Sequence, residues 1–331
     1  MRAHSNTNSP AGCLAKLGGS LVALATPFRE RRLDTETLAL LCDRQVKRGS
    51  SALVVCGTTG EAPALSAPEQ ARVVAVAVEA AAGRVPVIAG CGASATDTAA
   101  ALALAAARNG AIAVLCAPPA YAKPGQDGIA AHVRAVAHVA ELPVVLYDVP
   151  GRVGVAVADE TVARLFEYGL IAAIKDASGD LSRPARLRAL CGAELVQLSG
   201  DDATAPAYRA MGGHGCVSVT ANLVPALCAQ QHTAWDRGDL GAFARLRDLL
   251  APLHRALFLE SNPIPLKAAL SMLRLCTEEL RLPLTRAVEA TRSQLARVLD
   301  EVTRAENEAA TKPRLALVRQ AAPSSDHAPL R

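Results

Sequence analysis

A lysine ends a short apolar run near the middle of the chain. The segment Ile171–Asp176 reads IAAIKD, which places Lys175 directly after four apolar residues. Lysine is rarely buried unless it is paired or functional. Burial disfavours the charged amine, and a neutral amine can form an imine with a carbonyl compound. The pattern therefore indicates Schiff-base chemistry at Lys175, with an ion pair to Asp176 or Asp201 as the structural alternative.

Two of the four tyrosines also follow apolar runs. Tyr147 ends the run that begins at Pro143, and Tyr121 follows the run that ends at Cys116. A phenol can relay a proton when it is hydrogen-bonded to another hydroxyl, and Thr58 is a candidate partner. Each tyrosine taken alone is also typical of an amphipathic residue at the rim of a sheet.

Two further segments carry groups that could bind an anion. Thr58 and Thr59 lie between Gly57 and Gly60, where hydroxyls and free backbone N–H groups can form an anion-binding turn. Arg152 follows a Pro-Gly turn, and a guanidinium binds a carboxylate through two parallel hydrogen bonds. The alternatives are an ordinary tight turn and a solvated surface arginine.

The composition argues against several classes of protein. The net charge is +4 without a dense basic run and aromatic residues make up 3%, so nucleic-acid binding has little support. The nine cysteines form no CxxC pair and no zinc-ligand pattern, and we expect them to be reduced core residues. Neither a phosphate-binding loop nor an acidic metal-binding cluster is present. We expect no transmembrane helix, no signal peptide and a cytoplasmic location.

Eight short β-branched runs alternate with Ala- and Leu-rich helical stretches. The runs are almost continuously apolar, as expected of parallel strands that are covered on both faces. This order predicts an α/β protein with a (β/α)8 TIM barrel. A doubly wound sheet is the competing arrangement, but residues 25–28 lack its glycine-rich turn after the first strand. The predicted strands are Ser20–Ala25, Ala52–Cys56, Pro86–Gly90, Ile112–Cys116, Pro143–Tyr147, Ile171–Lys175, Leu195–Ser199 and Cys216–Val219.

The chain is predicted to have four parts. These are a flexible N-terminal tail (1–16), the barrel (17–222), a C-terminal helical appendix (223–304) and a tail predicted to be disordered (305–331). In barrels of this kind the active site lies at the C-terminal ends of the strands. The candidate residues all fall at or just after predicted strand ends, so the barrel would bring them together.

Taken together, these segments resemble the dihydrodipicolinate synthase / N-acetylneuraminate lyase family. The similarity covers about Leu17 to Leu299, and the motifs occur in the family's order. The matching stretches are GTTGEAPALS from Gly57, VPVIAGCGAS from Val85, PPAYAKPGQDG from Pro118, LYDVPGRVG from Leu146, IKDASGD from Ile174, LSGDDAT from Leu198, GGHGCVSVTAN from Gly212 and LFLESNPIPLKAAL from Leu257.

The resemblance implies a role for each candidate residue, with neither an organic cofactor nor a metal. The reacting amine and its proton relay would be Lys175, Tyr147, Thr58 and Tyr121. The binding residues would be Thr59 for the carboxylate of pyruvate, Arg152 for the carboxylate of an incoming aldehyde, and Gly200 and Val217 for the pocket wall. The resemblance also implies a homotetramer built as a dimer of tight dimers, in which Tyr121 reaches the neighbouring subunit's site.

Three functions are consistent with this resemblance. The first is condensation of pyruvate with aspartate semialdehyde, which belongs to lysine and diaminopimelate biosynthesis. The second is a sister aldolase that cleaves N-acetylneuraminate, 4-hydroxy-2-oxoglutarate or a keto-deoxy sugar acid. Lyases that act on sugar acids usually lack an arginine at the position of Arg152, so this residue favours the condensation. The third is a barrel that has lost catalysis, which the presence of Lys175, Tyr147, Thr58 and Tyr121 argues against.

The chain departs from the family pattern near the expected site. Asp148 stands where Asn is more common, Val153 where Thr is usual, and Ala120 where an aromatic residue is frequent. The departures at Asp148 and Val153 bear on the second substrate rather than on the reacting groups. Lysine-inhibited members tend to carry His, Asn and Glu at three other positions, so weak or absent inhibition by lysine is expected. This chain has Gln70, Ser94 and Thr98 there.

Overall fold

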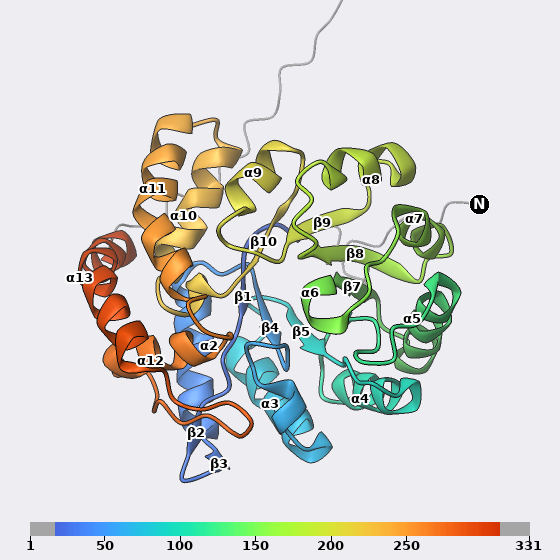
Figure 1. Cartoon of the computed structure of the whole chain (residues 1–331), viewed down its shortest axis with the longest axis horizontal. Coiled ribbons are helices and arrows are strands. Elements are labelled where there is room, and N and C mark those ends of the chain that lie inside the picture. Colours follow the sequence, from blue (N-terminus) through green and yellow to red (C-terminus); the bar gives the residue numbers. More distant parts are fainter. Residues whose placement is uncertain (1–16, 312–331) are drawn as a thin grey trace, which may run out of the picture.

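The computed structural model describes residues 17–311, and its centre is a closed barrel of eight parallel strands (Figure 1). The predicted barrel is confirmed, and each strand begins and ends within two residues of its predicted limits. The predicted tail 1–16 and residues 312–331 lie outside the described residues. In barrel order the strands are β1 (Gly19–Ala23), β4 (Ala52–Val55), β5 (Val87–Gly90), β6 (Ala113–Cys116), β7 (Val144–Asp148), β8 (Ile171–Asp176), β9 (Val196–Ser199) and β10 (Gly215–Ser218).

Helices follow the strands and surround the barrel (Figure 1). Two of their ends carry typical caps: the Ser66 hydroxyl accepts the Glu69 N–H in a capping box, and Gly49 ends the first helix in a left-handed conformation. These helices are α2 (Thr35–Arg48), α3 (Ala67–Ala81), α4 (Thr96–Arg108), α5 (Gln126–Ala140), α6 (Pro150–Val153), α7 (Asp159–Glu167), α8 (Arg183–Cys191) and α9 (Ala205–Ala210).

The strands separate two apolar layers because successive side chains point to opposite faces. One set of side chains, including Leu21, Val54 and Val217, fills the barrel interior. The other set, including Leu53 and Leu146, packs against the surrounding helices. Both faces are buried, which is why the strands read as continuous apolar runs in the sequence.

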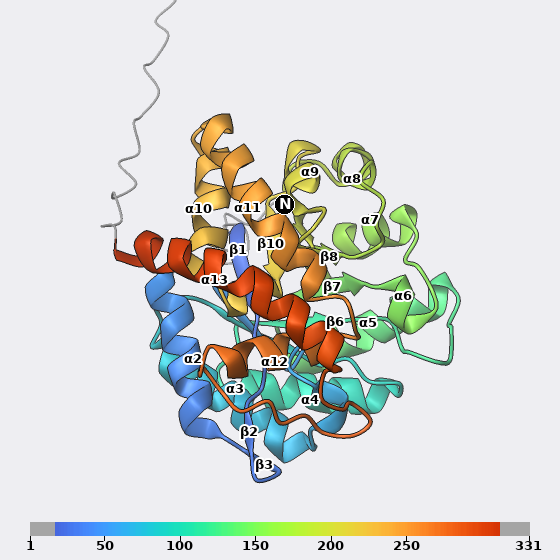
Figure 2. The ribbon, with the colours of Figure 1, turned by 60° about the vertical axis from the view of Figure 1, so that its left-hand side comes forward.

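Four helices form the C-terminal appendix and gather on one side of the barrel (Figures 1 and 2). They are α10 (Pro225–Asp236), α11 (Leu240–Ala256), α12 (Ile264–Met272) and α13 (Glu289–Thr311). The breaks between these helices fall at Gly238, at Pro263 and in a long connection that contains Pro283. No helix of the described residues is both long and apolar enough to cross a membrane.

The prediction of disorder from residue 305 is wrong for its first part, because α13 continues to Thr311. The segment looks polar, but one face of it is buried, at Val302, Glu306 and Ala309. The Glu306 carboxylate accepts the backbone N–H groups at the start of α10, from Ala226 and Leu227, at 3.1 and 3.0 Å. A buried carboxylate at a helix N-terminus satisfies donors that have no partner within the helix.

A small hairpin of β2 (Phe28–Arg29) and β3 (Arg32–Leu33) was not predicted. Its strands contain two residues each, too few for any periodic signal in the sequence. The connection between α12 and α13 lies beside it, and the Thr277 hydroxyl donates to the Phe28 carbonyl at 2.5 Å. The hairpin therefore links the start of the chain to the appendix.

Two buried histidines, His232 and His254, and the half-buried His214 make the fold sensitive to acid. Burial and the charge of Arg209 lower the pKa of His232 to about 3, from an ordinary value of 6.5. Burial also lowers the pKa values of His214 and His254. Below pH 6.5 the unfolded chain binds protons that these side chains do not bind in the fold, so stability is lost as the pH falls from 6.5 towards 3.

The contribution of His232 can be measured by replacing it. For a group that stays neutral in the fold, each pH unit below 6.5 lowers the free energy of unfolding by about 1.4 kcal/mol. His232 therefore lowers it by about 2 kcal/mol at pH 5. In urea unfolding, His232→Leu is expected to lose less stability between pH 7 and pH 5 than the wild type does. The matched control is His138→Leu at an exposed position. Equal pH dependence of wild type and His232→Leu would refute this assignment.

Candidate active site

The C-terminal ends of β7 and β8 bring Tyr147 and Lys175 together inside the barrel. The two residues are direct partners in the register of these strands. The Lys175 Nζ atom lies 4.1 Å from the centre of the Tyr147 ring. Both side chains are buried, with 6% and 9% of their surface exposed. The structure thus places an amine and a phenol in contact at the barrel mouth.

The alternative of an ion pair between Lys175 and Asp176 is wrong. Lys175 makes no ion pair within residues 17–311. Asp176 is the next residue of β8, so its side chain points to the opposite face, where it lies 3.4 Å from Arg183. Asp201, the other proposed partner, accepts the Thr204 hydroxyl at 2.6 Å. Among the residues that the structure describes, the amine is therefore left without a carboxylate partner.

A buried ion cluster lies on the outer face of the same two strands. The Arg183 guanidinium is 2.5 Å from Asp148 of β7 and 2.8 Å from Asp159, and it also reaches Asp176 of β8. Arg183, Asp148 and Asp176 are all almost completely buried. Burial raises the pKa of Asp148, while the guanidinium opposes this shift. Arg183 thus ties together the strand ends that carry Tyr147 and Lys175.

Sequence reasoning did not identify Arg183. The available signal was an arginine in the first turn of a helix, where a positive charge is unfavourable unless it has a partner. The cluster also explains Asp148, which departs from the Asn of the family pattern: its carboxylate accepts from Arg183 and from the Val157 N–H. Val153 is buried in the short helix α6.

The turn after β4 carries Thr58 and Thr59, whose side chains differ in burial. The turn is closed by backbone bonds, from the Gly60 N–H to the Gly57 carbonyl and from the Glu61 N–H to the Thr58 carbonyl, both 3.1 Å. Thr59 is buried, and its hydroxyl accepts the side-chain amide of a residue from the appendix. Thr58 is half-buried. The turn thus presents two hydroxyls at the carboxyl end of β4.

The remaining predicted binding residues also lie at the carboxyl ends of strands. Val217 points into the barrel interior from β10. Gly200 follows β9, and its N–H donates to the Asp176 carbonyl at 2.6 Å. A Cβ atom on Gly200 would lie 2.9 Å from the Cβ of Ala177, so only glycine allows this approach. Arg152 is exposed on α6, directly after β7.

Tyr121 is the predicted residue that the single chain does not bring into the site. Its side chain is 95% exposed, in the loop between β6 and α5. Within residues 17–311, the hydroxyls of Thr58, Tyr121 and Tyr147 form no hydrogen bond with one another. The predicted relay therefore has its amine, its first phenol and its threonine near the barrel mouth, whereas the second phenol lies in solvent.

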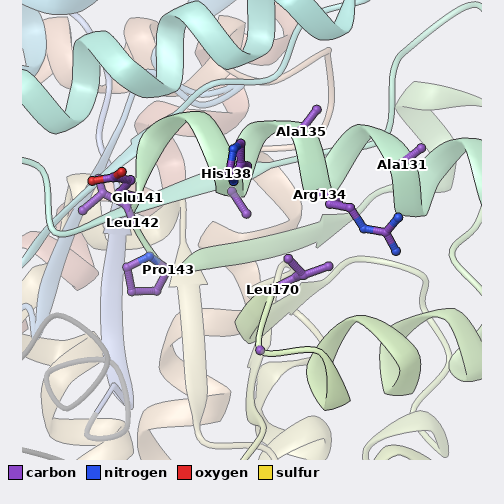
Figure 3. Close-up of a pocket in the computed structure, with 10 residues that line it drawn as sticks. Ala131, Arg134, Ala135, His138, Glu141, Leu142, Pro143 and Leu170 are labelled. Carbon is purple, nitrogen blue, oxygen red and sulfur yellow. The ribbon is translucent and has the colours of Figure 1, made fainter.

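A surface cavity of about 660 Å³ lies away from these residues (Figure 3). It is lined by Arg134, His138 and Glu141 of the α5 segment and by Pro143 and Leu170, which precede β7 and β8. This is the N-terminal end of the strands, opposite the candidate site. No group of three or more His, Cys, Asp or Glu side chains in the described chain could hold a metal ion.

Comparison with known proteins identifies the family. Residues 16–302 match the Dihydrodipicolinate synthetase family. The chain belongs to this family. A curated relative from Rhodospirillum centenum, named 4-hydroxy-tetrahydrodipicolinate synthase, is 48% identical over 83% of this chain and 94% of its own length. A relative of the same name from Hyphomonas neptunium is 50% identical over 81% of this chain and 92% of its own length.

Solved structures of family members have the same architecture. The crystal structure of a chloride-inhibited dihydrodipicolinate synthase from Acinetobacter baumannii, complexed with pyruvate, aligns with a TM-score of 0.83 and 39% identity. The alignment covers 86% of this chain and 99% of that one. The family's barrel and C-terminal helices are therefore present here in full, and the protein is an enzyme of the Dihydrodipicolinate synthetase family.

The ion cluster behind Tyr147 and Lys175 gives a prediction for stability. Arg183→Met leaves Asp148 and Asp176 buried without their counter-charge, and a loss of about 3–5 kcal/mol is expected in urea unfolding. Asp148→Asn should lower the free energy of unfolding by less, because Arg183 keeps its ion pairs with Asp159 and Asp176.

A matched arginine on the surface serves as the control. Arg164 pairs with Asp127, whose side chain is 94% exposed, so Arg164→Met should cost less than about 1 kcal/mol. A similar loss for Arg183→Met and Arg164→Met would show that the buried cluster does not hold the strand ends.

Proposed function

We propose that the protein condenses pyruvate with L-aspartate 4-semialdehyde to give 4-hydroxy-tetrahydrodipicolinate, through a Schiff base on Lys175. The observation that carries the proposal is the buried Lys175 amine against the Tyr147 ring, without a carboxylate partner in the described chain. The names of the curated relatives, 44–50% identical over more than four fifths of this chain, support the choice of reaction.

The proposed reaction begins with the Lys175 amine attacking the keto carbon of pyruvate. Water leaves and an imine forms. The protonated imine accepts electrons, so the methyl carbon of pyruvate loses a proton and an enamine results. The enamine carbon then bonds to the aldehyde carbon of aspartate semialdehyde. The amino group of that substrate finally attacks the imine carbon, which closes the ring and releases Lys175.

Protons move in several of these steps, and we assign their transfer to Tyr147. The centre of its ring lies 4.1 Å from the Lys175 Nζ atom, which supports this assignment. We assign the further relay to Thr58 and then to Tyr121. Because Tyr121 is 95% exposed in the single chain, we propose that it completes the relay in the site of a neighbouring subunit.

Two carboxylates must be bound, one on each substrate. We assign the pyruvate carboxylate to the hydroxyl and backbone N–H of Thr59, and the aldehyde's carboxylate to Arg152. Gly200 and Val217 would line the pocket from β9 and β10. The exposure of Arg152 is consistent with this role, because the second substrate arrives from solvent.

The assembly and location follow from the same proposal. The exposed Tyr121 supports a tight dimer in which each subunit supplies a phenol to the other. We propose a homotetramer made of two such dimers. A biosynthetic enzyme with reduced, mostly buried cysteines fits a cytoplasmic location.

The imine can be trapped chemically. Incubation with pyruvate and borohydride should add one reduced pyruvate unit at Lys175, detected by mass spectrometry of peptides. Lys175→Ala should show no adduct and should lose turnover by several orders of magnitude, because the nucleophile is gone. Lys47→Ala, at a surface lysine paired with Asp43, should behave as wild type. An adduct that forms on another lysine, or undiminished turnover of Lys175→Ala, contradicts the proposal.

The second substrate can be tested with a panel of aldehydes. Aspartate semialdehyde should give the highest kcat/KM. Arg152→Ala should raise the KM for this aldehyde about 10- to 100-fold, through loss of a charge-assisted hydrogen-bonded pair, and leave the KM for pyruvate unchanged. The control is Arg134→Ala at the opposite end of the barrel. Turnover with another aldehyde but none with aspartate semialdehyde would favour a sister aldolase instead.

A further inference from the structure

A residue of the appendix reaches the turn that holds the predicted carboxylate-binding threonine. Asn262 lies just before α12 and is 6% exposed. Its side-chain Nδ2 atom donates to the Thr59 hydroxyl at 3.0 Å, across 203 positions of sequence. Its backbone carbonyl accepts from Arg152 at 3.4 Å. Asn262 therefore touches both residues that we assign to substrate carboxylates.

Asn262 is held in place because α12 is fixed to the same turn. Lys267 of α12 is fully buried, and its Nζ atom lies 2.9 Å from the Glu61 carboxylate. The same Nζ donates to the Glu279 carbonyl at 2.8 Å, and the Arg281 N–H donates to Glu61 at 3.0 Å. The appendix is thus locked to the turn by a buried ion pair five residues beyond Asn262.

The direction of the bond between Asn262 and Thr59 decides what the hydroxyl can do next. A threonine hydroxyl has one hydrogen to donate and lone pairs to accept with. The Asn262 amide donates to a lone pair of the Thr59 hydroxyl. The hydroxyl itself donates a hydrogen bond to no other group within residues 17–311. Its hydrogen is consequently available to an anionic ligand at the barrel mouth.

We infer that Asn262 is a positioning residue that orients the Thr59 hydroxyl as a donor to the carboxylate of pyruvate. This rests on the proposed function, which assigns that carboxylate to Thr59. Asn262 acts through Thr59 and need not touch the substrate itself. Because imine formation holds the carboxylate next to Lys175, the effect belongs to pyruvate binding and not to the later bond-forming step.

The experiment measures how imine formation depends on pyruvate. The pyruvate concentration that gives half-maximal borohydride trapping on Lys175 is determined, together with the KM for pyruvate and kcat. The variants are Asn262→Asp, Asn262→Ala, Thr59→Val and the double variant Asn262→Ala/Thr59→Val. Asn109→Ala is the matched control, since its side chain makes one hydrogen bond, to the Ala105 carbonyl, at the end of α4.

The aspartate variant has nearly the shape of asparagine but presents only acceptors when ionised. It would accept the hydrogen bond that the Thr59 hydroxyl donates, and it would place a negative charge beside the substrate. Asn262→Asp is expected to raise half-saturating pyruvate on the order of 100-fold. Asn262→Ala, which loses one neutral hydrogen bond, is expected to raise it about fivefold. At saturating pyruvate, kcat should stay within about twofold of wild type for Asn262→Ala.

The double variant tells whether Asn262 acts through the Thr59 hydroxyl or only stabilises the surrounding fold. In the Thr59→Val background, Asn262→Ala should raise half-saturating pyruvate no further, because the hydroxyl it orients is absent. The inference would be overturned if Asn262→Ala raised half-saturating pyruvate equally in the wild-type and Thr59→Val backgrounds. It would also be overturned if Asn262→Asp raised half-saturating pyruvate no more than Asn262→Ala does. Absence of trapping in the wild type would instead refute the proposed function. Thermal melting of each variant identifies any loss of folding.

Discussion

The register of β7 against β8 is the constraint on which the site depends. Parallel pairing sets Tyr147 opposite Lys175 on the inner face and Asp148 opposite Asp176 on the outer face. A slip of one residue would turn the amine and the phenol towards the helices, because side chains alternate between the faces. Arg183 joins the two outer carboxylates, so a buried charge cluster holds the pairing that the inner face needs.

The site divides between rigid strands and loops that the appendix supports. Lys175, Tyr147 and Val217 come from strands of the closed barrel, where packing on both faces limits movement. Thr59 and Arg152 come from the connections after β4 and β7. Both of them bond to Asn262, which links the loops to a helix far away in the chain. The appendix thus contributes to the site as well as to the core.

This division suits the reaction proposed above, which has one fixed and one variable partner. The groups proposed to form and serve the imine, Lys175 and Tyr147, are buried in the barrel. Arg152, the residue that we propose for the aldehyde's carboxylate, is exposed on a four-residue helix, so a substitution there would not disturb the barrel. Tyr121 is still more exposed, and its place in the proposed relay requires a second copy of the chain.

The amino-acid sequence by itself determined the barrel, because each βα unit is a local pattern of an apolar run, a cap and a helix. It also placed Lys175 and Tyr147 at the ends of such runs, where this fold gathers its chemistry. Only the tertiary structure decided the partners that arrive from elsewhere: Arg183 against Asp148, and Asn262 against Thr59 across 203 positions. It also extended α13 past the predicted tail boundary at residue 305, since Glu306 caps a helix 80 residues earlier in the chain. Contacts of this kind depend on how finished elements pack against one another, and no local pattern in the sequence records that.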